Sequence, residues 1–323
     1  MSFKKVAALA AVAALALSGC AQASTSSSSA AGDHKDMKIC VYTHGDGGTF
    51  WTVAQKGAEA AAADLGVTLD YQGSTNDAAK QASTIEAGVA AGCKGIAASA
   101  PDPAAIKSAM LAAHDAGIPT VTMNSGSSVF AELGAFTHVG QDEIIAGEQA
   151  GLKFNAMGVK HVLCPLQEAA NIGLTQRCEG LAKTFKGKTT NFNLDGGLAD
   201  LTAASAKIKA ALQADKSIDA VFALNADIAA KAVLPAAESL SLSLKIGTVD
   251  MSPEALQAIK DGKMEFAIDQ QQYAQGYMSV VLLYLALTNG NELGGGAPIY
   301  SGPGFVTKDN VANVMALVKA GTR

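Results

Sequence analysis

Short apolar runs alternate with longer alanine-rich segments along most of the chain, and this alternation limits the fold more than any other feature. In the first part it predicts strands at 39–43, 67–71, 95–99 and 119–123, and helices at 50–65, 76–91 and 103–116. Each of these helices is followed by a glycine, the residue that most readily adopts the left-handed conformation of a helix C-terminus. Strands that alternate with helices in this way are typical of βαβ units and parallel sheets.

The same pattern starts again after about residue 140. Strands are expected at 161–166, 189–193, 220–224, 244–249 and 266–269, and helices at 143–157, 174–185, 201–214, 228–239, 253–260, 273–287 and 309–320. We therefore predict an α/β protein with two doubly wound parallel-sheet lobes that face each other across a cleft. Ligands of such sheets bind beyond the carboxyl ends of the strands, so the residues after each apolar run are the candidate site.

The N-terminal segment indicates export. Two early lysines precede an apolar run at 6–17, which resembles the core of a secretory signal and is too short to span a membrane. The run ends in Leu-Ser-Gly-Cys, which resembles a bacterial lipobox, so 1–19 is interpreted as a signal peptide and Cys20 as the lipidated residue. An ordinary signal peptide with an unrelated cysteine is the alternative. Residues 20–36, largely alanine and serine, are expected to form a flexible tether that holds the exported protein at the outer face of the cell membrane.

The charge balance excludes one class of partner. Without residues 1–19, the chain has 22 basic and 29 acidic side chains, a net charge of −7, and its two arginines are Arg177 and Arg323. Nucleic-acid binding requires clustered lysine and arginine, so no nucleic-acid partner is expected. The same balance disfavours a strongly anionic ligand.

Polar side chains follow several of the predicted strands. They are Asn124, Ser125, Asn225, Asp250 and Gln270. Amides, hydroxyls and a carboxylate can together donate to and accept from hydroxyl groups, which is the mixture that a polyhydroxylated ligand requires. Helix capping, which asparagine, aspartate and serine also perform, is the alternative for any one of them.

A glycine-rich turn follows the first strand and contains His44 and Asp46, which are candidate ligand-binding residues. It is not a GxGxxG sequence, and no acidic residue ends the second strand, so a dinucleotide site is not expected. Phe50 and Trp51, the latter the single tryptophan, stand at the junction of this turn with the next helix. That position suits stacking on the C–H face of a sugar, and packing in the core is the alternative.

Sequences typical of catalysis are absent. The chain contains no GxSxG, HExxH or P-loop sequence, and its histidines lack metal-ligand spacing, so no metal and no cofactor are expected. A binding protein is therefore favoured over an enzyme. An exported glycoside-processing enzyme, in which Asp46 and Asp250 would meet across the cleft, stays as an alternative.

Several segments in a fixed order resemble a known family. They are Phe50-Trp51, Asn76 and the stretches 117–124, 138–142, 177–180, 220–225 and 268–271. Over about 37–307 the chain resembles the ribose-binding-like periplasmic sugar-binding proteins of ABC importers, which have the type I periplasmic binding protein fold. The resemblance implies three crossovers, near Gln141, near Gln270 and near 301–302, that form a three-strand hinge. The N-terminal lobe would comprise 37–141 plus 271–301, and the C-terminal lobe 142–270 plus 302–323.

The resemblance also implies a binding site. Phe50 and Trp51 match the stacking aromatics of the family, and Asn225, Asp250 and Gln270 match its polar contacts. Asn171 is a further candidate.

Two departures make this site less charged than that of a ribose-binding protein. Asn124-Ser125 replaces an Asp-Arg pair, and Thr175 replaces a ligand-binding arginine, whereas Arg177 matches an arginine expected to be structural. A small neutral sugar or sugar alcohol is therefore the expected ligand. The resemblance implies that a monomer closes on it about the hinge and delivers it to an ABC transporter permease. A receptor that presents a signal molecule to a membrane sensor is the alternative.

Four cysteines remain besides Cys20, and they allow three pairings. An even number in an exported protein indicates disulfides. The predicted topology favours Cys40–Cys93, because Cys40 begins the first strand and Cys93 directly precedes the strand expected beside it. It favours Cys164–Cys178, because these cysteines lie in the first strand of the second lobe and in the helix that follows. Buried free thiols are the alternative.

Overall fold

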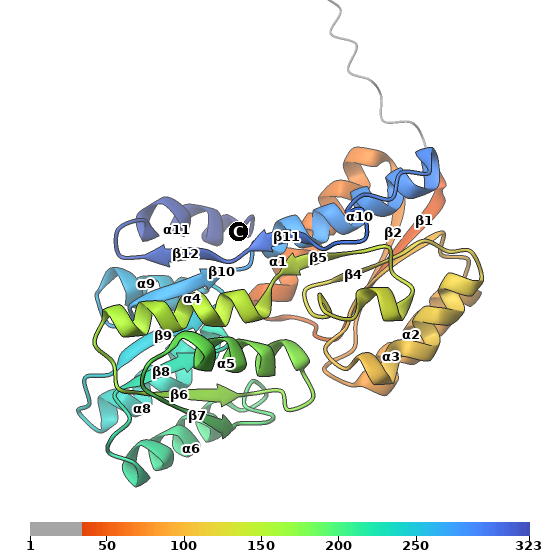
Figure 1. The fold of residues 1–323 in the computed structure, drawn as a ribbon. Coiled ribbons are helices and arrows are strands. Elements are labelled where there is room, and N and C mark those ends of the chain that lie inside the picture. Colours follow the sequence, from red (N-terminus) through yellow and green to blue (C-terminus); the bar gives the residue numbers. More distant parts are fainter. Residues whose placement is uncertain (1–33) are drawn as a thin grey trace, which may run out of the picture.

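Two six-stranded sheets with helices on both faces form two lobes that lie side by side (Figure 1). The computed structural model describes residues 34–323, so the predicted signal peptide (1–19) and the lipidation of Cys20 lie outside the described residues. The predicted α/β fold with two doubly wound lobes is confirmed. Within the described range, no helix has the length and apolarity that crossing a membrane requires.

The first lobe, here the N-lobe, contains the sheet β11-β5-β4-β3-β1-β2, in which every neighbouring pair is parallel. Its elements are β1 (His34–Thr43), α1 (Gly48–Leu65), β2 (Val67–Gly73), α2 (Ala78–Ala90), β3 (Gly95–Ser99), α3 (Pro103–Asp115), β4 (Thr120–Met123), the 3₁₀ helix η1 (Phe130–Leu133), β5 (Thr137–Gln141), α10 (Gln272–Asn289) and β11 (Ile299–Gly302). The strand order reverses at β1, which places the end of β1 at the topological switch point where ligands bind.

The second lobe, here the C-lobe, contains the sheet β12-β10-β9-β8-β6-β7, parallel except for β12, which runs antiparallel to β10. Its elements are α4 (Glu143–Ala156), β6 (His161–Leu166), α5 (Ile172–Thr184), β7 (Lys188–Asn193), α6 (Leu201–Ala214), β8 (Ala220–Ala223), α7 (Ala226–Ile228), the π-helical turn η2 (Ala229–Val233), α8 (Leu234–Ser239), β9 (Lys245–Val249), α9 (Pro253–Lys260), β10 (Phe266–Asp269), β12 (Gly304–Thr307) and α11 (Val311–Ala320).

The chain passes between the lobes at three places: after β5, after β10, and between β11 and β12. In Figure 1 the long α10, drawn in blue, returns to the N-lobe, and β12 with α11 then lies on the C-lobe. These passages lie where the family resemblance places the crossovers.

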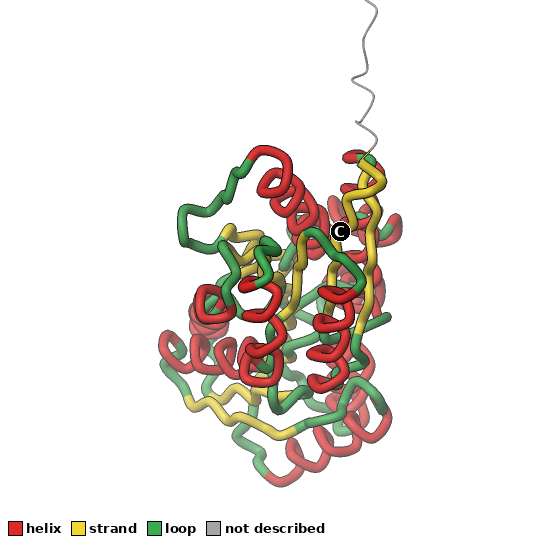
Figure 2. Tube along the Cα trace, turned by 90° about the vertical axis from the view of Figure 1, so that its right-hand side faces the viewer, coloured by secondary structure: helices red, strands yellow, loops and turns green. Residues whose placement is uncertain are grey.

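Each sheet is covered by helices on both faces, as Figure 2 shows, where yellow strands run between red helices. Alternate residues of β1 therefore enter two different cores, because successive side chains of a strand point to opposite faces. Ile39 and Val41 pack with apolar residues of α1 and α10, whereas Cys40 and Tyr42 pack with those of α2 and α3. This double burial is the reason that the strands appear in the sequence as unbroken apolar runs.

Glycines let pairs of helices approach closely in both lobes. Gly57 of α1 lies against the backbone of α10, and Gly276 of α10 lies against the backbone of α1. In the C-lobe, Gly147 of α4 and Gly180 of α5 have the same reciprocal arrangement. A side chain at any of these positions would collide with a carbonyl group of the facing helix, so the pairs fix how α1–α10 and α4–α5 cover their sheets.

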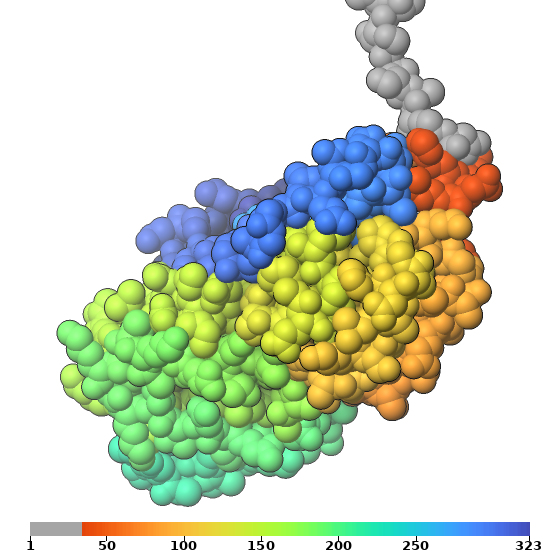
Figure 3. Space-filling model, turned by 45° about the vertical axis from the view of Figure 1, so that its right-hand side comes forward, coloured from red at the N-terminus to blue at the C-terminus, as the bar shows by residue number. Residues whose placement is uncertain are grey.

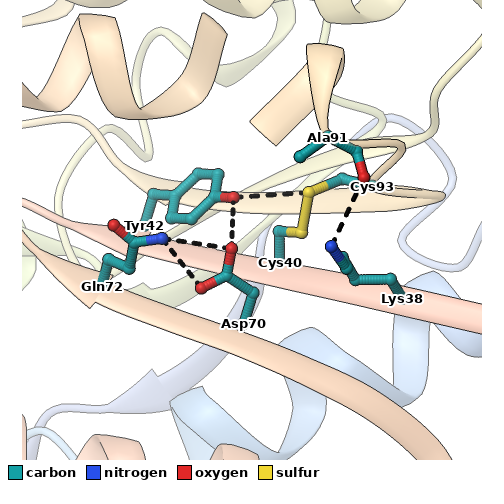
Figure 4. The surroundings of a disulfide bond; sticks show 7 residues. All are labelled: Lys38, Cys40, Tyr42, Asp70, Gln72, Ala91 and Cys93. Atoms are coloured by element: carbon teal, nitrogen blue, oxygen red, sulfur yellow. Dashed lines mark hydrogen bonds between the residues drawn. A yellow bond between two sulfur atoms is a disulfide. The ribbon is translucent and has the colours of Figure 1, made fainter. Parts of the chain in front are cut away.

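Both disulfides that the topology favours are present in the structure. Cys40 is bonded to Cys93, and Cys164 is bonded to Cys178. Figure 4 shows the first bond, beside which the Tyr42 hydroxyl donates to Oδ2 of Asp70 at 3.0 Å and lies 3.3 Å from Sγ of Cys93. Burial, with the neighbouring carboxylate, raises the pKa of Tyr42, so this phenol stays protonated.

Some predicted boundaries are wrong. The tether was expected to extend to residue 36, but β1 begins at His34, where the chain pairs with Val67 of β2. Residues 34–36 are polar, and they are placed in the strand because His34 pairs with Val67, although the register shifts before the next pair, Lys38 with Thr68. Strands β5, β11 and β12 were not predicted, since they contain glycine and polar residues.

Candidate ligand-binding cleft

A cavity of about 340 Å³ lies between the lobes, at the carboxyl ends of their strands. Ten of the eleven predicted site residues line it: His44, Asp46, Phe50, Trp51, Asn124 and Ser125 from the N-lobe, and Asn171, Asn225, Asp250 and Gln270 from the C-lobe. Its size is within the range of small-molecule sites. We call this cavity the inner cleft.

Thr175 is the predicted site residue that does not line the inner cleft. It lies in α5, whose first turn is capped by the Asn171 side chain. Leu174 and Arg177, three positions apart on α5, face the cavity. Thr175 is one position after Leu174, so its side chain is turned by about 100° around the helix axis from that of Leu174.

Aromatic rings form one wall of the inner cleft. The indole of Trp51 lies edge-on to both His44 and Phe50, with ring centroids 4.8 Å apart in each case. Gly45 permits this arrangement, because a side chain there would collide with the indole. Phe50 is largely buried and belongs also to the core of the N-lobe, so Trp51 is the ring with more surface left for a ligand.

His44 is fixed by Ser99 at the end of β3. Its backbone N–H donates to Oγ of Ser99 at 2.7 Å, and its Nδ1 lies 2.8 Å from the same oxygen. Nε2 points across the cleft and lies 3.7 Å from Oε2 of Glu168 in the C-lobe. Burial lowers the pKa of His44, and although Glu168 opposes this, Arg177 adds to it, so the imidazole is neutral near pH 7.

The two lobes touch each other beside the cleft. The backbone N–H of Ile172 donates to the carbonyl of Pro101 at 3.0 Å, and Nε2 of Gln176 donates to Oγ of Ser128 at 3.1 Å. The Ser125 hydroxyl lies 3.4 Å from Oδ1 of Asn171. Figure 3 shows the N-lobe (orange and yellow) and the C-lobe (green) in contact, which indicates a closed arrangement.

A buried charged network forms the floor of the cleft. Arg177 donates from Nε and Nη2 to the two carboxylate oxygens of Glu143, at 2.5 and 2.9 Å. It also donates from Nη1 to the carbonyl of Leu224 and from Nη2 to Oε1 of Gln270. Gln141, at the first crossover, donates to Oε2 of Glu143 at 2.8 Å. Arg177 is therefore held by protein acceptors, and its charge is matched inside the protein.

Asp250 is the carboxylate at the centre of the C-lobe wall. It accepts hydrogen bonds from Nε2 of Gln270 at 2.5 Å and from Nδ2 of Asn225 at 3.3 Å. Burial raises the pKa of Asp250 to about 7, with Arg177 acting in the opposite direction. Oδ1 of Asn225 also accepts the backbone N–H of Asp227, so Asn225 both caps a helix and lines the cavity.

Several residues that line this cleft have an unfavourable backbone conformation. Six non-glycine residues between 34 and 323 have a positive φ, and four of them line the cavity: Thr75, Asn76, Asn124 and Asp250. Such conformations cost free energy and are concentrated at functional sites. The fold therefore holds these four side chains in positions that relaxed loops would not give them.

Some lining residues were not predicted as site residues. Gln167 and Glu168 line the cavity directly after β6, so the rule of polar residues after strands could have found them. Arg177 was expected to be structural, and it both lines the cavity and forms the buried ion pair. Among the described residues, the group that brings three potential metal ligands together is Cys40, Asp70 and Cys93, whose two sulfurs form the disulfide.

Residues 39–292 match the family model described as a periplasmic binding protein domain. The chain belongs to the periplasmic binding protein family. It is 42% identical to the crystal structure of a carbohydrate transporter from Acidothermus cellulolyticus 11B in complex with myo-inositol, with a TM-score of 0.85, covering 89% of this chain and 99% of that one. The family and fold implied by the resemblance are therefore confirmed.

Two curated relatives are similar to most of the chain. A xylose/arabinose-binding protein from Sulfolobus acidocaldarius is 23% identical over 86% of this chain and 73% of its own. A ribose import binding protein from Bacillus subtilis is 26% identical over 74% of this chain and 78% of its own.

Proposed function

We propose that this protein is an extracytoplasmic solute-binding lipoprotein that captures a small neutral sugar or sugar alcohol in the inner cleft. We further propose that it delivers this ligand to the permease of an ABC transporter as a monomer. The names of its relatives support the class of ligand, and the myo-inositol in the Acidothermus cellulolyticus structure makes that cyclic sugar alcohol the first candidate.

The observation that carries this proposal is the composition of the inner cleft. One wall presents Trp51, which can stack on C–H groups, and the other presents Asn225, Asp250 and Gln270, which can donate to and accept from hydroxyls. The guanidinium of Arg177 is already matched by Glu143. No uncompensated positive charge among the described lining residues is thus left for an anionic ligand.

Closure of the lobes about the three crossovers would bury the ligand. Contacts from both lobes favour the closed state over an open one, because a ligand shifts an equilibrium by its differential affinity for the two states. A hydroxyl buried without a partner is costly, so ligands with the wrong hydroxyl pattern would be rejected. The ligand leaves unchanged, since this role needs no bond-making step.

Thermal unfolding of the purified protein against sugars, sugar alcohols, amino acids and nucleosides tests the proposal. A ligand at 100 times its dissociation constant adds about 2.7 kcal/mol of stability, which is visible as a raised midpoint. We expect a shift with myo-inositol or a few monosaccharides, and chromatography should recover the ligand unchanged. A shift confined to amino acids or nucleosides, or formation of a product, would contradict the proposal.

Lipid anchoring at Cys20 needs its own test. Expression in a bacterial host should yield a membrane-bound form, and Cys20→Ser should release the protein from the membrane. A Cys20→Ser variant that partitions with membranes as the natural chain does would exclude the anchor without affecting the proposed ligand.

A further inference from the structure

A second cavity, of about 470 Å³, adjoins the inner cleft. The two cavities share part of their wall, including Thr75, Asn76, Gln167 and Glu168. Exposed residues such as Ala170 line the second cavity, which we call the outer compartment. Both lobes contribute to it, so its occupant would touch both.

Gln167 stands on the wall that separates the two spaces. Gln167 is 3% exposed, and it lines both cavities. A ligand that extends from one cavity into the other would therefore pass beside this residue.

The outer compartment is acidic. Its lining includes Asp102, Glu168 and Asp195, and among its described lining residues there is no lysine or arginine. Asp195 accepts the backbone N–H of Ala169 through Oδ1, and Glu168 accepts the amide of Asn171 through Oε2. Within the described chain, the other oxygen of each of these two carboxylates accepts no protein hydrogen bond. These oxygens can accept hydroxyl protons of a ligand and would repel an anion.

We propose that the outer compartment is a subsite for a second hydroxylated unit, joined through a glycosidic bond to the unit in the inner cleft. The ligand class is therefore a neutral glycosylated polyol or disaccharide. This inference rests on the proposed function and deepens it, because it adds a size and a charge preference to the sugar-binding role. The second unit contacts both lobes and thus favours closure as the first unit does.

Titration calorimetry with matched ligand pairs tests the subsite. Myo-inositol is compared with galactinol, its galactosyl derivative, and D-xylose with xylobiose. In at least one pair the glycosylated member is expected to bind more tightly than the smaller one, and a tenfold lower dissociation constant would correspond to about 1.4 kcal/mol. Myo-inositol 1-phosphate, which adds an anion instead, is expected to bind much more weakly than galactinol.

The outcomes separate this inference from the proposed function. Weaker binding of the glycosylated member than of the small member in both pairs, or no heat from either glycosylated member, would overturn the subsite and leave the sugar-binding role intact. Tighter binding of the phosphate than of galactinol would also overturn it. No binding by any member of either pair would count against the sugar-binding role and the subsite together.

A size variant then locates the second unit. Ala170→Phe places a large side chain in the outer compartment and is expected to raise the dissociation constant of the glycosylated ligand at least about tenfold more than that of the small one. Ala210→Phe, at an exposed position of α6 outside both cavities, is the matched control and should leave the ratio unchanged. An unchanged ratio in Ala170→Phe would place the second unit elsewhere and contradict the inference.

Discussion

Arg177 donates hydrogen bonds to both carboxylate oxygens of Glu143, and the two residues are buried, with exposed fractions of 4% and 2%. Glu143 begins α4 directly after the first crossover, and Arg177 faces the inner cleft from α5. The pair therefore connects a passage between the lobes to the floor of the ligand site. Through Gln270 it also reaches the second crossover.

Removing one member of this pair should be strongly destabilising. Arg177→Met leaves the Glu143 carboxylate buried without its cation, and such losses typically cost about 3–5 kcal/mol. Urea unfolding measures the change. Lys263→Met is the control, because its ion pair with Glu238 is exposed and such surface pairs contribute little to stability. Equal losses in the two variants would show that burial does not set the importance of the Arg177 pair.

Asp250 should make stability depend on pH. Its folded-state pKa is raised to about 7 by burial, above the unfolded value of about 3.9. The folded protein thus holds this proton more tightly, so the contribution is fully present below about pH 4 and is lost as pH rises through about 7. Asp250→Asn should remove this loss of stability at rising pH. Unfolding midpoints of the natural protein and of Asp250→Asn, measured between pH 4 and pH 8, test the expectation.

The comparison with Asp250→Asn is necessary because His44 acts in the opposite direction. Burial lowers the pKa of His44, so its contribution is present at high pH and is lost as pH falls below the unfolded value of about 6.5. His44 is present in both the natural protein and Asp250→Asn. The difference in stability between the two proteins therefore reports the contribution of Asp250 alone. A variant whose stability relative to the natural protein is constant across this range would contradict the raised pKa.

The sheets could be predicted from the sequence, and the charged network could not. Strands such as β3 and β10 are buried on both faces, which leaves unbroken apolar runs that any periodicity analysis detects. Strands β11 and β12 have no such run, because they contain glycine and polar residues, are only partly buried and flank Pro303. Their place in the sheets is set by partners far away in the chain.

The site was predictable to the extent that polar residues directly follow strands. Asn124, Asp250 and Gln270 satisfy this rule, and all three line the inner cleft. Glu143 and Arg177 do not, because each lies within a helix where a charged residue normally indicates an exposed face. Their burial depends on how α4 packs against α5, which a sequence without its fold does not reveal.

Trp51 should change its fluorescence when ligand binds and should contribute to the affinity for the ligand. It is the single tryptophan of the chain and lines the inner cleft, so a saturating ligand should change its fluorescence. Trp51→Ala removes the stacking surface and is expected to weaken binding about 10- to 100-fold, since buried aromatic anchors contribute about 2 kcal/mol or more. Calorimetry measures the affinity, and Tyr300→Ala, an exposed position outside the cavity, serves as control. Unchanged affinity in Trp51→Ala would mean that the ring packs only against protein.

The two disulfides should differ in what they contribute to stability. Cys40 and Cys93 are separated by 53 residues, and Cys164 and Cys178 by 14. If each bond stabilises chiefly by restricting the unfolded chain, replacing the first pair by alanines should cost about 4 kcal/mol and replacing the second about 3 kcal/mol. Urea unfolding of the two double variants measures this, with the natural protein under reducing conditions as a check on their sum. The reverse order would indicate that packing around Cys164 and Cys178 in the folded C-lobe, and not loop closure in the unfolded chain, decides the difference.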